Sequence, residues 1–89
     1  MTQNELKSTL KRYMEVPRLS GYEGEMTKLF RNDLQARGGS CQQDRFGNVI
    51  AEFSGTDPEA PRVMVFTHMD TIGFVVTNID EQGFLYVDR

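Results

Sequence analysis

The stretch that decides the fold of this chain is Arg62-Val63-Met64-Val65-Phe66-Thr67-His68-Met69-Asp70-Thr71-Ile72-Gly73-Phe74. Its first half is a short apolar run that follows Pro61 and ends at His68. Such a run predicts a strand over residues 62–68 that is buried on both faces, as in a parallel sheet covered by helices. Ligands bind at the carboxyl ends of strands in open α/β sheets, so the polar residues that end this strand are candidates for a site.

His68 and Asp70 are two residues apart, so on an extended chain their side chains point to one face while Met69 points to the other. A neutral imidazole can bind zinc, cobalt or manganese through one nitrogen while a carboxylate holds the other nitrogen. A catalytic zinc ion needs about three protein ligands, which one His and one Asp do not supply. The spacing alone therefore favours a simpler interpretation, in which His68 ends a strand and Asp70 begins a turn.

The composition limits the kind of protein this is. The 89 residues make one domain at most, or part of one, with 38% hydrophobic residues, 26% charged residues and a net charge of -3. The sequence has no basic patch of the kind that binds nucleic acid. It has no apolar stretch long enough to span a membrane, and its polar N-terminus is not a signal peptide. Cys41 is the single cysteine, which excludes an internal disulfide and fits a reducing cytoplasm. We expect it to be a small, partly buried side chain at the start of a strand.

Two helices are predicted in the first half of the chain. Residues 4–14 carry apolar side chains at helical spacing with charges opposite them, and Pro17 limits this helix. A second helix is expected over residues 21–37, with a capping box formed by Ser20 and Glu23. The Gly38-Gly39 pair that follows can stop a helix, and it lacks the spacing of a nucleotide-binding fingerprint.

Short strands and turns are predicted for the rest of the chain. The order after the helices is a hairpin, the buried strand and a second hairpin, with strands expected at residues 40–45, 49–53, 62–68, 72–78 and 84–87 and turns at 46–48 and 80–83. A sheet buried on both faces needs helices on both sides, and both predicted helices precede it. We therefore expect either the front part of a larger protein or a chain that a partner completes.

The chain resembles the amino-terminal part of the tetrahedral (glutamyl, or deblocking) aminopeptidases, a family of two-metal metallopeptidases. The resemblance covers nearly the whole chain and rests on segments in one order and spacing: Ser20-Gly21-Tyr22-Glu23, 44–51, 61–65, His68-Met69-Asp70-Thr71-Ile72-Gly73-Phe74 and 79–85. It implies an α/β fold, the front part of a zinc-peptidase-like three-layer domain over residues 1–74. Residues 75–89 would then start an inserted β domain that the family uses in assembly into large oligomers.

The same resemblance implies a function for the pair. His68 would be a metal ligand and Asp70 its catalytic partner, in a cytoplasmic enzyme with two divalent ions, zinc or cobalt. The substrate would be a peptide with a free amino terminus, cleaved by water that the two ions activate. Some members of the family carry an endoglucanase label.

Two departures from the family qualify this expectation. Thr71 stands where the family commonly has an acidic residue, and the remaining metal ligands and the general base would follow the inserted domain, beyond Arg89. We therefore expect no aminopeptidase activity from this chain alone and at most weak metal binding. The alternative is a non-catalytic αβ module for binding or assembly. The His68–Asp70 pair favours the enzyme, and the missing ligands favour the module.

Overall fold

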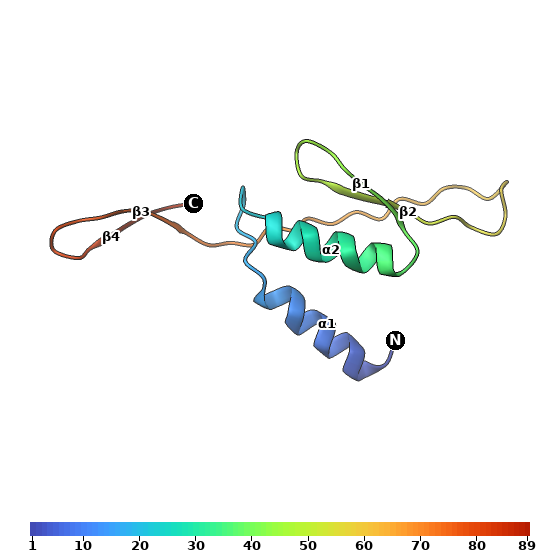
Figure 1. Ribbon diagram of the computed structural model, residues 1–89, viewed down its shortest axis with the longest axis horizontal. Helices are drawn as coiled ribbons and strands as arrows, with labels where there is room; N and C mark the ends of the chain where they lie inside the picture. The colour runs from blue at the N-terminus through green and yellow to red at the C-terminus, as the bar shows by residue number, and fades with distance from the viewer.

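The computed structural model describes residues 1–89, which form two helices and two antiparallel β-hairpins (Figure 1). This small α/β arrangement agrees with the predicted class, and it is flat and elongated, with extents of 65 × 34 × 17 Å. Neither helix has the length and apolar character needed to cross a bilayer. The elements in order are α1 (Gln3–Glu15), α2 (Gly24–Ala36), β1 (Ser40–Gln43), β2 (Val49–Glu52), β3 (Val75–Ile79) and β4 (Leu85–Asp88).

The first predicted helix is confirmed as α1, and it begins with a capping box that the sequence analysis missed. The Thr2 hydroxyl accepts from the Glu5 N–H at 3.2 Å, and the Glu5 carboxylate accepts from the Thr2 N–H. These two bonds satisfy N–H groups that have no partner inside the helix. The helix ends at Glu15 with an extended Val16, because the residue before Pro17 avoids helical geometry.

The capping box predicted for the second helix at Ser20 and Glu23 is wrong. Gly21 has a φ of +84°, which is incompatible with a helix there, so α2 begins only at Gly24. The Glu23 carboxylate turns back and accepts from the Gly21 N–H at 2.9 Å. The predicted helix stop is confirmed, because Gly38 has a φ of +89° and its N–H donates to the Gln35 carbonyl at 2.9 Å.

A polar cluster joins the two helices. The Tyr13 hydroxyl donates to Asp33 Oδ2 at 2.7 Å, and the Arg12 guanidinium pairs with the same oxygen. The Tyr13 ring also meets Phe30 edge to face, with centroids 6.3 Å apart. Because Met26 is the only buried apolar side chain, this cluster supplies much of what fixes α1 against α2.

The two predicted hairpins are confirmed, except that β3 begins at Val75 and not at residue 72 as expected. Both hairpins turn through the same Asp-x-x-Gly sequence. Asp44 and Asp80 each accept, through Oδ1, from the N–H groups two and four residues on, at 2.9–3.0 Å. Gly47 and Gly83 close the turns with φ of +89° and +88°. The hydrogen bond from the Asn48 side chain, aided by the backbone donors, lowers the pKa of Asp44.

The hairpins occupy different parts of the molecule (Figure 1). The β1–β2 hairpin packs against α2, and Phe53 after β2 lies so close to Gly39 that a Cβ there would come within 2.8 Å of its ring. Cys41 in β1 is partly buried, as expected. The β3–β4 hairpin extends away from the helices at the other end, with a bulge between Val76 and Asn78.

The prediction of a buried central strand over residues 62–68 is wrong. These residues are extended and lie in no strand, and the side chains from Val63 to Phe66 are 85–91% exposed. No backbone hydrogen bond joins residues 62–70 to the rest of the chain. An apolar run becomes a strand only where a neighbouring strand pairs with it, and the sheets here are β1–β2 and β3–β4.

Tyr13 should make the stability of this fold depend on pH at the alkaline end. Burial, aided by the hydrogen bond to Asp33 and its charge, raises the pKa of Tyr13 to about 12 from the ordinary 10.0. The folded chain therefore holds this proton more tightly than the unfolded chain. The stability it contributes is complete below pH 10 and is lost as the pH rises through about 12.

The measurement is urea unfolding by circular dichroism across this pH interval. Tyr13→Phe, which cannot ionise, should lose stability less steeply than the wild type. Lysine titration affects both proteins equally, so the difference isolates Tyr13. Equal slopes for the two proteins would contradict the assignment.

Gly38 should be costly to replace. An alanine at its φ of +89° adopts a left-handed conformation, so Gly38→Ala should destabilise the chain by about 1 kcal/mol. Gly55→Ala is the matched control, because Gly55 has an ordinary φ and open space around its Cα. Urea unfolding should show the loss only for Gly38→Ala, and equal effects at the two positions would exclude a special backbone requirement at Gly38.

Candidate functional site

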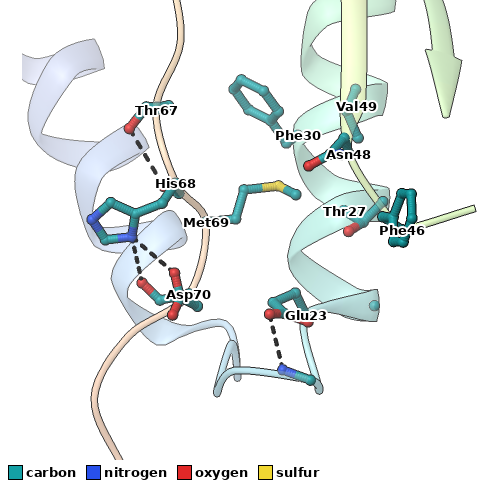
Figure 2. A pocket seen from close by; sticks show the side chains of 13 residues that line it. Glu23, Thr27, Phe30, Phe46, Asn48, Val49, Thr67, His68, Met69 and Asp70 are labelled. Carbon is teal, nitrogen blue, oxygen red and sulfur yellow. Dashed lines mark hydrogen bonds and ion pairs between the residues drawn. The ribbon is translucent and has the colours of Figure 1, made fainter. Parts of the chain in front are cut away.

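His68 and Asp70 lie on one side of the extended segment that follows the apolar run, and Met69 points to the other side, toward α2 (Figure 2). His68 Nδ1 is 2.9 Å from Oδ1 of Asp70 and 3.1 Å from the Asp70 backbone carbonyl oxygen. The same-face geometry expected from their spacing is therefore confirmed, and the two side chains contact each other directly.

The partners of the imidazole decide which nitrogen is free. Both groups near Nδ1 are oxygens that accept hydrogen bonds, so Nδ1 carries the proton. In the neutral ring, Nε2 then keeps its lone pair and is the atom available to a metal ion. The His68 side chain is 82% exposed, so this nitrogen is open to solvent.

A short contact with the loop after α1 holds the segment just beyond Asp70. The Thr71 N–H donates to the Arg18 carbonyl at 2.9 Å, and Leu19 and Thr71 form an isolated parallel bridge. The two candidate residues thus lie next to an anchored point of a segment that is otherwise unpaired.

A hollow of about 310 Å³ lies between this segment, α2 and the β1–β2 turn. Its carboxylates are Glu23 and Asp70, and no Lys or Arg lines it. Sequence reasoning treated Thr27, Phe30 and Asn48 only as parts of a helix and a turn, because nothing in their local pattern shows that packing brings them beside residues 67–70. The lining residues are Gly21, Glu23, Gly24, Thr27, Phe30, Phe46, Gly47, Asn48, Val49, Thr67, His68, Met69 and Asp70.

The residues present fit one position of a metal site. No three His, Cys, Asp or Glu side chains gather closely enough to hold an ion, whereas a catalytic zinc site uses about three protein ligands. His68, oriented by Asp70, has the chemistry of a single ligand. The roles of metal ligand for His68 and catalytic residue for Asp70 stay predictions.

Comparison with known proteins shows what the sequence of this chain is similar to. The sequence model for M42 glutamyl aminopeptidase matches residues 47–89, which include His68 and Asp70. The chain is 42% identical to the lysyl aminopeptidase of Pyrococcus furiosus over 79 residues, which are 88% of this chain and 22% of that protein. It is 30% identical to the glutamyl aminopeptidase of Lactococcus lactis over 79 residues, which are 89% of this chain and 22% of that protein. No solved structure matches the chain.

The chain spans 20–25% of the length of the curated relatives it matches. Nearly all of it takes part in these matches, and the family match covers the second hairpin, the apolar run and the His-x-Asp pair. The chain is therefore similar to the M42 glutamyl aminopeptidases through the family match over residues 47–89, and to curated aminopeptidases over most of its length.

Proposed function

We propose that this chain supplies one metal ligand of a metal-dependent aminopeptidase, with His68 as the ligand and Asp70 as the carboxylate that orients it. The observation that carries the proposal is the 2.9 Å contact between His68 Nδ1 and Asp70 Oδ1, which leaves Nε2 free. Similarity to aminopeptidases supports it, because the matched residues include His68 and Asp70. A binding module would have no need of this pair.

The substrate in this proposal is a peptide with a free amino terminus. Two bound divalent ions, zinc or cobalt, would polarise the scissile carbonyl and lower the pKa of a water between them. The role proposed for this chain is limited to one ligand, His68, and the carboxylate that orients it. Asp70 keeps the proton on Nδ1, fixes the plane of the ring and makes Nε2 a stronger ligand.

The chain alone should not turn over substrate. It contains a single histidine, and no further His, Cys, Asp or Glu gathers around the pair. With one ligand supplied, the affinity for a metal ion should be weak. Glu23, the other carboxylate that lines the hollow, does not form a metal-holding group with His68 and Asp70.

The proposal extends to fold and assembly. Residues 1–74 would be the front part of a three-layer zinc-peptidase-like domain, and 75–89 would start an inserted β domain. In support, β3 begins at Val75 and its hairpin extends away from the helices (Figure 1). Apolar side chains of this hairpin are exposed. A full-length protein of this kind would be a cytoplasmic homo-oligomer that binds neither nucleic acid nor membrane.

A non-catalytic module for binding or assembly is the second candidate. The apolar side chains of Val63 to Phe66 are exposed on an unpaired extended segment, a surface that invites association. In this case the His68–Asp70 pair would have no metal to bind. The two candidate functions therefore differ in whether His68 binds zinc.

Zinc binding by the isolated chain is the first test. Calorimetry should give a dissociation constant in the high micromolar to millimolar range. Asp70→Asn should weaken binding roughly 10-fold or more, because carboxylate partners of ligating histidines contribute that much. His68→Ala should abolish it. Glu81→Gln, which removes an exposed carboxylate in the β3–β4 turn, should leave binding unchanged.

Zinc binding that survives His68→Ala would overturn the ligand assignment, and absence of binding by the wild-type chain would favour the module. A second measurement is a zinc-supplemented assay with leucine and glutamate chromogenic substrates. The chain should show no turnover. Turnover that a chelator abolishes would contradict the incomplete site.

A further inference from the structure

The peptide unit between Asp70 and Thr71 connects the candidate site to the loop after α1. Its N–H donates to the Arg18 carbonyl at 2.9 Å, and its carbonyl oxygen lies 3.1 Å from His68 Nδ1. Because a peptide unit is planar, the direction of its N–H fixes the direction of its carbonyl. The loop therefore sets the angle at which this carbonyl meets the imidazole of His68.

Hydrogen bonds to α1 and within the loop hold Arg18 and Leu19 in place. The Arg18 guanidinium donates to the Tyr13 carbonyl, and the Leu19 carbonyl accepts from the Tyr22 N–H at 2.8 Å. Tyr13 is itself bonded to Asp33 of α2. An uninterrupted series of contacts thus runs from the helix pair to the Asp70–Thr71 peptide.

Gly73 is what allows the segment to approach this loop. A Cβ built on Gly73 would overlap Leu19 Cδ2 and come within 3.3 Å of Leu19 Cγ. The φ of Gly73 is ordinary, unlike those of Gly21 and Gly38, so glycine is required here for space and not for backbone conformation. A larger residue must displace either Leu19 or the segment that carries Thr71.

We propose that Gly73 and Leu19 are positioning residues for the His68–Asp70 pair. Their close approach keeps the Thr71 N–H on the Arg18 carbonyl and so presents the Asp70 carbonyl, together with its carboxylate, to Nδ1. The importance of this positioning for metal binding rests on the function proposed above. The positioning itself is a property of the chain without metal.

The single histidine gives this proposal a direct readout. Nitrogen-15 NMR of the imidazole reports which ring nitrogen carries the proton, and one histidine gives one set of signals. The wild-type chain should show mainly the Nδ1–H form at a pH where the ring is neutral, and slow hydrogen exchange at the Thr71 amide. A merely structural glycine would not change the ring tautomer.

Gly73→Ala should reduce the ratio of Nδ1–H to Nε2–H roughly fivefold, since hydrogen bonds to charged groups are strong enough for such a change. It should also speed exchange of the Thr71 amide. Gly55→Ala is the matched control and should leave both readouts unchanged, because open space surrounds Gly55.

The double variant Leu19→Ala with Gly73→Ala removes the methyl groups that the new Cβ would meet. The double variant should restore both the wild-type ring tautomer and the slow hydrogen exchange of the Thr71 amide. This recovery is expected even if Gly73→Ala alone loses helix content by circular dichroism. An unchanged tautomer in Gly73→Ala, or no recovery in the double variant, would overturn the proposal. Both readouts are taken without metal, so a failure of zinc to bind His68 is a separate result.

Discussion

The hydrogen bond from the Thr71 N–H to the Arg18 carbonyl is the contact on which the arrangement of this chain depends. It is the one backbone hydrogen bond that joins residues 54–74 to the loop between the two helices. The long segment before Thr71 is extended and exposed, so its position follows from this attachment, from the close fit of Gly73 and Leu19, and from Met69 pointing toward α2. A chain with little buried core thereby holds a histidine and an aspartate in one geometry.

Local chemistry made much of the fold predictable. Helix ends and turns were read correctly where one residue determines the backbone, as with Pro17, Gly38 and the Asp80 turn. The start of α2 was predicted wrongly. The Ser20–Glu23 pattern resembles a capping box, but Gly21 between these residues has a left-handed backbone conformation. The box that does form, at Thr2 and Glu5, shows the same chemistry at an ordinary helix start.

The strand predicted at residues 62–68 shows where local sequence stops being sufficient. Its apolar run has the composition of a strand buried on both faces, yet pairing and cover come from other elements, and β1, β2, β3 and β4 pair elsewhere. The candidate site likewise has one part that the local sequence predicts and one part that it does not. The His68–Asp70 contact followed from the period of an extended chain, whereas the hollow beside it depends on α2 and the β1–β2 turn, which only tertiary packing brings there.

We propose that His68 presents Nε2 to a metal ion while Asp70 holds Nδ1. Zinc K-edge X-ray absorption on the zinc-loaded chain tests this most directly, because imidazole ligands have a distinctive scattering pattern. The spectrum should show one imidazole nitrogen at about 2.0–2.1 Å from the zinc ion, with oxygen ligands completing the coordination shell. The imidazole contribution should vanish in His68→Ala. A coordination shell of oxygen alone in the wild-type chain would contradict the assignment of His68 as a metal ligand.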